Sequence, residues 1–349
     1  MKSFDLSRCR VLDLSQNFSV DSPPFAYYEG PTIKWVKKMA FEGVNAQHIS
    51  STNHIATHLD SPLHFNDPGP DVAGIPIGAL VGPACIVDLQ QFGVGDYDIY
   101  GPKHFEQWER KFGIRIERGD ILVIHTGYHA YYNEDWSPAT KRQHADARPD
   151  LPRSFLRHPG PRAEFCDWVL DRGIRWMAID AISTDHPFNT KVRDARRDLV
   201  PEVEKKIGMS MDQAFPWPRD YQATHTKLFP RGVFHVENVG GEIDLVLNQR
   251  VWVGCFPFRF KGGEAAFCRF VAFVEAEGHT VTAEPVRPAA AIVRPTLPAP
   301  RPSPPGRSAT RPSRPPRRPA RPKRAGPKRA GPKRRGRAGR PARRQGRRR

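Results

Sequence analysis

Three histidines and one aspartate lie within eleven residues of this chain, at His54, His58, Asp60 and His64. All four positions share the same parity, and side chains alternate between the two faces of an extended chain. All four side chains would therefore project from one face of a strand or its extension. A helix would place His54 and His58 on one face without Asp60, and Pro62 disfavours a helix here. The spacing thus predicts an extended segment with four polar groups on one side.

Imidazole nitrogen and carboxylate oxygen are the usual protein ligands of zinc, manganese and iron. Three such ligands with an open position are typical of a catalytic metal site, where the ion lowers the pKa of a bound water toward neutrality. A further histidine near the ion could shuttle protons. A chance histidine-rich loop, or histidines satisfied in a core, would explain a lone histidine better than this set. The run therefore predicts a divalent-metal site in a metal-dependent hydrolase.

Charge is spread unevenly along the 349 residues. The segment 287–349 holds 23 Lys and Arg, 15 Pro and no Asp or Glu. The whole chain has 55 basic and 37 acidic residues, which leaves 32 basic and 37 acidic residues in 1–286, an ordinary balance for an enzyme. The composition predicts one folded domain over 1–285 and a disordered basic tail over 286–349, because the tail cannot bury enough apolar surface.

Two interpretations of the tail stay open at this stage. It could attract nucleic acid or another polyanion without sequence preference, or it could be a solvated segment with no selected role. No aromatic residue lies among its arginines, so base stacking is excluded.

The five cysteines form no C-x-x-C pair, which argues against a disulfide framework and a cysteine zinc knuckle. The first sixteen residues lack the apolar core of a signal peptide, and no stretch approaches the ~18 apolar residues of a membrane span. We therefore expect a cytoplasmic protein without membrane segments.

Short β-branched runs predict strands, and apolar residues at helical spacing predict helices, so the body is of the mixed α/β class. We expect strands near 84–89, 121–125, 176–179 and 267–274, and helices over 104–112 and 162–170, the second closed by Gly173. The charged, proline-bounded stretch 186–222 is expected to be a partly helical excursion. It could act as a lid or be a solvated surface insertion.

The run from His54 to His64 resembles H-x-G-T-H-x-D-x-P-x-H, the signature of the cyclase family of metal-dependent hydrolases. That family includes bacterial kynurenine formamidase, isatin hydrolase and a dienelactone hydrolase. Ala56 stands where the family usually has Gly, a change that should require only a modest backbone adjustment. The similarity extends over most of 10–275, through Gly119-Asp120 with Thr126-Gly127, through Asp180, Ser183 and Asp185, and through His225 and Glu237, twelve residues apart.

The resemblance implies a swivelling β/β/α fold, with a mixed β-sheet or barrel flanked by helices, and a homodimer or larger oligomer. It implies one or two divalent ions, Zn or Mn. His54, His58 and Asp60 would hold the first ion, Asp60, His225 and Glu237 would bridge to or hold a second, and His64 would be the acid/base.

The activity that the resemblance implies is hydrolysis of a small amide, N-formyl or lactone bond. Arylformamidase activity, from N-formylkynurenine to kynurenine, is the first expectation, and hydrolysis of isatin or a dienelactone is the alternative. Aromatic residues that could line the pocket are Phe25, Tyr27, Tyr28, Trp35, Phe65, Phe215 and Trp217. An alternative of another class is a non-catalytic protein that binds a small molecule, or a polyanion through its tail. Loss of ligands would favour it, yet all six expected positions are filled.

Overall fold

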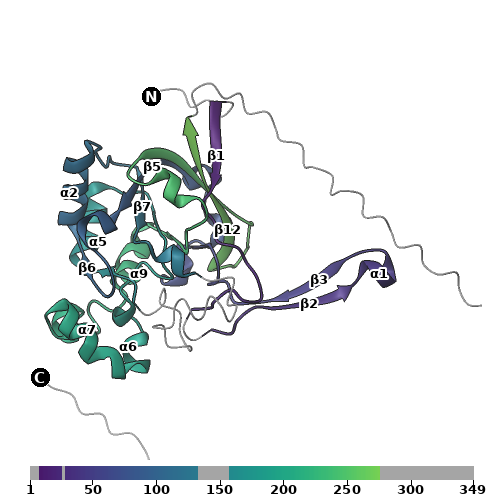
Figure 1. Ribbon diagram of the computed structural model, residues 1–349, viewed down its shortest axis with the longest axis horizontal. Coiled ribbons are helices and arrows are strands. Elements are labelled where there is room, and N and C mark those ends of the chain that lie inside the picture. Colours follow the sequence, from purple (N-terminus) through teal and green to yellow (C-terminus); the bar gives the residue numbers. More distant parts are fainter. Residues whose placement is uncertain (1–7, 26–27, 133–156, 276–349) are drawn as a thin grey trace, which may run out of the picture. The chain divides into compact units, whose positions relative to one another are not determined.

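The computed structural model describes residues 8–25, 28–132 and 157–275 (Figure 1). The predicted tail, 286–349, lies outside the described residues. Eight strands form one sheet in the order β1-β12-β11-β5-β7-β9-β10-β4, and β4 also pairs with β12, so seven strands close into a barrel. The strands are β1 (Cys9–Asp13), β4 (His58–Asp60), β5 (Val81–Asp88), β7 (Ile121–His125), β9 (Met177–Ile179), β10 (His235–Glu237), β11 (Arg250–Pro257) and β12 (Ala265–Glu275).

The barrel is mixed. Strands β5, β7, β9 and β10 run parallel, whereas β1, β4, β11 and β12 pair in antiparallel fashion. The parallel strands are apolar almost throughout because both of their faces are covered. Ile86, Val123 and Val236 lie on the face that fills the barrel interior. Ile124 and Ile179 lie on the other face, which packs against the helices. This alternation decides on which side of the sheet each polar group at a strand end lies.

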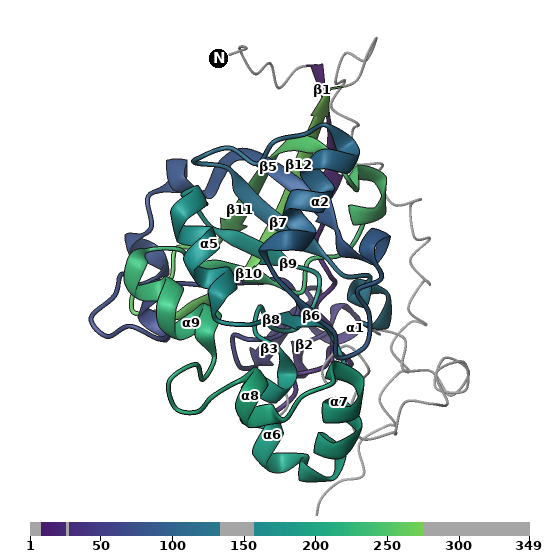
Figure 2. The ribbon, with the colours of Figure 1, turned by 90° about the vertical axis from the view of Figure 1, so that its left-hand side faces the viewer.

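Helices cover the outer face of the parallel strands (Figure 2). The helices nearest the sheet are α2 (Pro102–Phe112), α5 (Glu164–Arg172) and α9 (Ala223–Leu228). Phe105 of α2 stacks on Phe165 and Trp168 of α5, with ring centroids 5.3 and 5.0 Å apart. Helix α5 is capped at its C-terminus by Gly173, whose φ of 68° is the left-handed conformation that glycine adopts without strain.

The stretch 186–222 forms a small helical unit with a core of its own. It contains α6 (Val192–Ala195), α7 (Val200–Ile207) and α8 (Met211–Ala214). Phe188, Val203, Met211 and Phe215 are fully buried together within it. The partly helical excursion is thus present, and its role as a lid stays a prediction.

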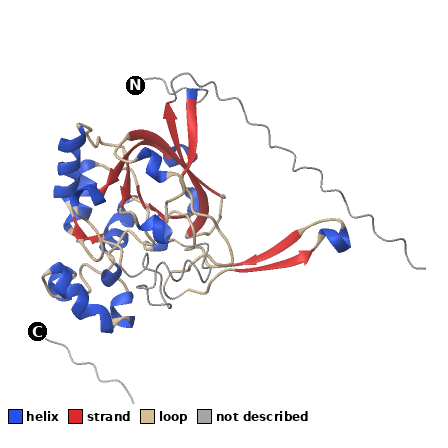
Figure 3. Ribbon diagram, viewed as in Figure 1, coloured by secondary structure: helices blue, strands red, loops and turns tan. Residues whose placement is uncertain are grey.

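A hairpin extends away from the barrel (Figures 1 and 3). It consists of β2 (Thr32–Lys37), the short helix α1 (Met39–Glu42) and β3 (Ala46–Ser50). A separate two-stranded sheet is formed by β6 (Ile99–Tyr100) and β8 (Gly160–Pro161). Among the described residues, no helix is long and apolar enough to cross a membrane.

The predicted mixed barrel flanked by helices is confirmed, and the predicted strands and helices match the observed ones to within a few residues. The prediction of one extended segment over 54–64 is wrong. Strand β4 covers only His58–Asp60, because Ala56 adopts a left-handed turn with φ 53° and Pro62 begins a 3-10 helix, η2 (Pro62–His64). The conformation of Ala56 also explains why a glycine would suit this position.

Candidate metal centre

Strands β4 and β10 place four polar side chains on one patch of the sheet. In their antiparallel register His58 faces Glu237, and Asp60 faces His235. The residues between them, such as Leu59, point into the barrel interior. The four polar side chains therefore project from the outer face, where all four are buried. Parity predicts this correctly for His58 and Asp60.

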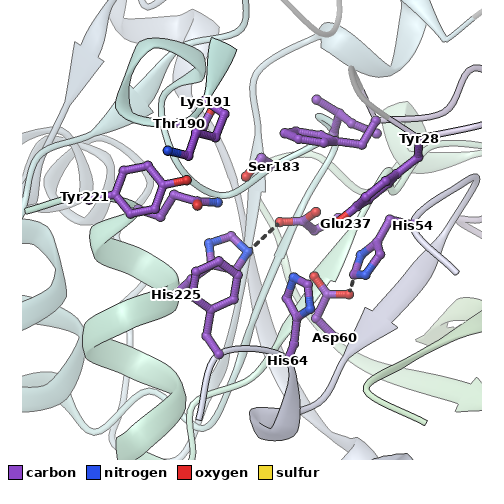
Figure 4. A pocket seen from close by; sticks show the side chains of 14 residues that line it. Tyr28, His54, Asp60, His64, Ser183, Thr190, Lys191, Tyr221, His225 and Glu237 are labelled. Atoms are coloured by element: carbon purple, nitrogen blue, oxygen red, sulfur yellow. Dashed lines mark ion pairs between the residues drawn. The ribbon is translucent and has the colours of Figure 1, made fainter. Parts of the chain in front are cut away.

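The other predicted site residues reach the same patch from turns and from α9. His54 approaches across the turn at Ala56, and its Nδ1 lies 3.1 Å from Asp60 Oδ1. His225 projects from α9, and its Nε2 lies 3.6 Å from Glu237 Oε1. His64 comes from η2, with its ring centroid 4.4 Å from that of His54. Figure 4 shows these side chains turned toward one another. The structure thus brings together all six: His54, His58, Asp60, His64, His225 and Glu237.

The potential metal-ligand atoms at the centre of this cluster make no hydrogen bonds with the described residues. Within the described part of the chain, both carboxylate oxygens of Asp60 and Nε2 of His58 are buried and make no hydrogen bond, although Asp60 Oδ1 has an ion-pair contact with His54 Nδ1 at 3.1 Å. His58 Nε2 lies 3.5 Å from Asp60 Oδ1 and 3.7 Å from Glu237 Oε2, which is too long for a good hydrogen bond. Ligand atoms around a tetrahedral zinc ion lie about 3.3 Å apart. The residues present therefore fit a divalent cation, which would satisfy these atoms.

Several polar groups orient the ligands without being part of the predicted set. The Ala56 carbonyl accepts from Nδ1 of His58 at 2.9 Å, which leaves Nε2 for the centre. Asp185 Oδ2 lies 2.6 Å from Nδ1 of His225, and Glu264 Oε2 lies 2.8 Å from Nδ1 of His64 and 3.0 Å from Nε2 of His54. Carboxylates that hold the second nitrogen of a histidine fix its ring and its tautomer.

Sequence reasoning did not assign a role to Asp185, and it missed His235 and Glu264. His235 joins His225 and Glu237 in one group of donor atoms. The alternation of His235 with Glu237 in a short strand could have revealed it. Glu264 has no such signal, because it reaches the site from the distant start of the β12 segment.

Comparison with known proteins identifies the family to which this chain belongs. A family model described as "Putative cyclase" matches residues 12–186. The chain belongs to the cyclase family. This cyclase is 26% identical over 194 residues to a kynurenine formamidase of Bacillus thuringiensis (strain Al Hakam), which covers 54% of the chain and 76% of the relative.

Solved structures with the same fold include two isatin hydrolases. Isatin hydrolase A from Ralstonia solanacearum superposes with a TM-score of 0.58 at 20% identity, covering 76% of this chain and 92% of the other. Isatin hydrolase A from Labrenzia aggregata, bound to benzyl benzoate, gives 0.59 at 20% identity, covering 77% and 95%. The predicted membership of the cyclase family is confirmed, and these relatives agree with the predicted class of enzyme, a hydrolase of amide C–N bonds.

Burial and mutual charge shift the pKa values of the cyclase centre strongly. Burial, together with the like charge of Asp60, raises the pKa of Glu237 to about 8. Burial lowers the pKa of His58 to about 4. Although burial alone would raise it, the nearby His54 and His58 hold the pKa of Asp60 well below its usual range. Two buried carboxylates and a neutral imidazole form a site in which added positive charge is strongly favoured.

A cavity of about 170 Å³ opens beside these groups (Figure 4). Three of the predicted aromatic residues, Phe25, Tyr28 and Phe65, line it. Of the others, Phe215 is buried in the helical unit and Trp35 is half exposed on the hairpin, so neither lines the cavity. Trp217 instead packs edge-on against Tyr221, and Tyr27 lies outside the described residues. The two ends of the helical unit contribute Thr190, Lys191, Tyr221 and Gln222.

Proposed function

We propose that this cyclase is a metal-dependent hydrolase that cleaves a small amide or N-formyl bond, with arylformamidase activity as its first candidate. The observation that carries the proposal is the set of buried atoms of His58 and Asp60 that make no hydrogen bond with any described residue, next to a cavity that Asp60 lines. Buried polar atoms without hydrogen bonds are rare, and here they lie beside the cavity that a substrate would enter.

In this proposal His54, His58 and Asp60 hold a first ion, and Asp60, His225 and Glu237 bridge to or hold a second. Nitrogen and carboxylate ligands suit Zn or Mn. When bound, the ion supplies a polarised water at neutral pH and Lewis acidity toward a carbonyl oxygen. Asp185 and Glu264 keep the histidine rings in place, which spares the centre reorganisation during the reaction.

His64 is proposed as the acid/base. Its Nδ1 lies 2.8 Å from Glu264 Oε2, so Nδ1 carries the proton that Glu264 accepts, and Nε2 is left for the cavity that His64 lines. Nε2 would take a proton from the attacking water and deliver it to the leaving nitrogen. The contact with Glu264 orients the ring, as a carboxylate does for a catalytic histidine elsewhere.

The cavity favours a small substrate with an aromatic ring and a negative charge. Its volume is below the ~300–1,000 Å³ of sites for drug-sized ligands. Phe25, Tyr28 and Phe65 offer aromatic contact, and Lys191 adds a cation to the lining. N-formylkynurenine has an aromatic ring for the aromatic lining, a formamide for the metal centre and a carboxylate for Lys191. Isatin and lactones such as dienelactones are the alternative substrates, and neutral isatin would gain nothing from Lys191.

Metal analysis of the purified chain, coupled to a hydrolysis screen of N-formylkynurenine, isatin and small lactones, tests the proposal. We expect one or two equivalents of Zn or Mn in this centre and the highest kcat/KM for N-formylkynurenine. A fully metal-loaded chain that hydrolyses none of these compounds would contradict the proposed reaction. A ranking with isatin first would keep the hydrolase and replace the substrate.

We further propose that residues 1–285 act as the hydrolase unit of a homo-oligomer and that the tail is accessory. Truncation after Pro285 should retain hydrolysis, and any affinity for a polyanion such as heparin should be lost with the tail. A truncated chain without activity would show instead that the tail is required.

A further inference from the structure

A second cluster of histidines and carboxylates lies at the carboxyl ends of the parallel strands. His125 ends β7 and Asp88 ends β5, and the two residues are register partners. Both continue the alternation of Val123 and Ile86, which fill the barrel interior. They therefore lie on the opposite face of the sheet from Asp60 and its partners. Asp180 directly follows β9, and His129 lies in the 3-10 helix η6 (Tyr128–Tyr131).

Three donor atoms converge in this second cluster. His125 Nε2 lies 3.7 Å from Asp180 Oδ2, and His129 Nδ1 lies 3.2 Å from the same oxygen. His125 is 1% exposed, and its Nε2 makes no hydrogen bond with any residue that the structure describes. These separations bracket the value of about 3.3 Å between ligand atoms around a tetrahedral zinc ion. Since all three ligand atoms lie within 4.8 Å of one another, His125, His129 and Asp180 are close enough to share one ion.

Two outer carboxylates turn the ring nitrogens toward this centre. Asp88 Oδ1 lies 2.9 Å from Nδ1 of His125, and Asp244 Oδ2 lies 3.3 Å from Nε2 of His129. The other oxygen of Asp244, Oδ1, lies 3.6 Å from Nε2 of His125. Asp88 can accept the proton of His125 Nδ1, and Asp244 can accept that of His129 Nε2. The lone pairs of His125 Nε2 and His129 Nδ1 are then directed at Asp180. A carboxylate behind each histidine is the usual second layer of a metal site.

Asp180 is held in place from its other side. Its Oδ1 accepts from the N–H and the hydroxyl of Thr126 at 2.8 and 2.6 Å, and its Oδ2 accepts from the N–H of Gly127 at 2.7 Å. The Thr126-Gly127 pair that marks the family resemblance therefore fixes one carboxylate of this cluster. None of His125, His129 and Asp180 lines the cavity of the first centre.

We infer that His125 Nε2, His129 Nδ1 and Asp180 Oδ2 bind a further divalent cation, a transition metal of the zinc class, with a structural role. The ion would join the end of β7, the end of β9 and the η6 turn. Two nitrogens and one carboxylate oxygen suit zinc better than calcium or magnesium, which prefer all-oxygen sites. Protonated histidines paired with the same carboxylates would give similar contacts without an ion, and the experiment separates these two states.

The test is zinc content per full-length chain after zinc loading and dialysis, measured by inductively coupled plasma mass spectrometry. His129→Ala removes one ligand, and His48→Ala, on the exposed strand β3, is the matched control. We expect His129→Ala to hold one zinc fewer than the wild type, and His48→Ala to match the wild type. An equal zinc content in His129→Ala and His48→Ala would overturn the inference.

A second pair of variants separates this site from the first centre. Asp60→Ala should lose the ion or ions of the first centre and keep one zinc, and the double variant Asp60→Ala, His129→Ala should hold none. Asp88→Asn should weaken the remaining zinc in the Asp60→Ala background about 10- to 100-fold in a chelator competition. A folded Asp60→Ala chain without zinc would contradict the second site, whereas loss of hydrolysis in that variant bears only on the proposed reaction.

Discussion

The two polar clusters of this cyclase use the same residue types but differ in how far the protein itself satisfies them. In the first centre both oxygens of Asp60 and Nε2 of His58 make no hydrogen bond with the described residues, and a cavity opens beside them. In the second cluster His125 Nε2 likewise makes no hydrogen bond, but Asp180 accepts from the backbone of Thr126 and Gly127, and neither His125 nor Asp180 lines that cavity. The contrast teaches that the types of metal ligand do not by themselves indicate a catalytic site. A catalytic site is indicated when such ligands also adjoin a cavity that a substrate can enter.

The largest effect is expected from Asp60→Asn. The amide removes a negative charge from a site with two buried carboxylates, and Asp60 is proposed to hold both ions. We expect loss of metal from the first centre and a fall in kcat/KM of at least about 10³-fold, comparable to the loss of a principal electrostatic group. Asp120→Asn is the matched control, because Asp120 is also buried and directly precedes β7. Full metal content and activity in Asp60→Asn would contradict the proposal that Asp60 holds the metal of the first centre.

His64→Ala should come next in effect, because it removes the acid/base and leaves the ligand set in place. We expect kcat to fall about 10²- to 10⁴-fold, with metal content within error of the wild type. Glu264→Gln should cause a smaller fall in kcat and alter the pH profile, since it removes the carboxylate that orients His64. Unchanged turnover and pH dependence in His64→Ala would rule out its proposed role.

Lys191→Met should change substrate preference and leave the chemistry intact. The cation at the cavity wall is proposed to attract a substrate carboxylate, so KM for N-formylkynurenine should rise about tenfold while kcat changes little. KM for a neutral lactone is the internal control and should stay within about twofold. Equal increases in KM for charged and neutral substrates would point to packing and not to charge.

The smallest effect concerns stability against acid. Buried His186 receives the N–H of Phe188 on Nδ1, while its Nε2 lies 3.0 Å from the Tyr97 carbonyl, so the ring is held neutral. Burial lowers the pKa of His186 to about 3, whereas the unfolded chain has the ordinary value near 6.5. Between these values the unfolded chain binds the extra proton, so acidification favours unfolding.

The free energy of unfolding should therefore fall by about 1.4 kcal/mol per pH unit from this group as the pH decreases below 6.5. His186→Asn retains an acceptor for Phe188 and should flatten this slope in urea titrations between pH 6.5 and 4.5. His48→Asn, on an exposed strand, should leave the slope unchanged. An identical slope in both variants would show that His186 contributes nothing to acid sensitivity.

Much of the fold was predictable from the sequence, and so was the set of residues at the first centre. Strands such as 121–125 are short apolar runs whose burial on both faces leaves little alternative. Parity also predicted the shared face of His58 and Asp60. It failed for His54 and His64, because the left-handed Ala56 and the 3-10 helix at Pro62 are turns that a period-2 pattern does not contain.

Other features depend on tertiary contacts that no local pattern encodes. Glu264 joins His54 and His64 only because β12 returns to pair with β4 and closes the barrel. Likewise, His125 and Asp180 meet because parallel strands bring their carboxyl ends together, although 54 residues separate them. The position of each predicted aromatic residue was equally unspecified, so Trp35 and Phe215 were candidates for a cavity that they do not line.

The most direct test of the first centre is a metal-edge anomalous difference map from crystals of active, full-length protein. If His58 and Asp60 hold a metal ion, the map will show a peak about 2.0–2.3 Å from His58 Nε2 and a carboxylate oxygen of Asp60, beside the cavity. Active crystals with no anomalous peak among His54, His58, Asp60, His225 and Glu237 would contradict it.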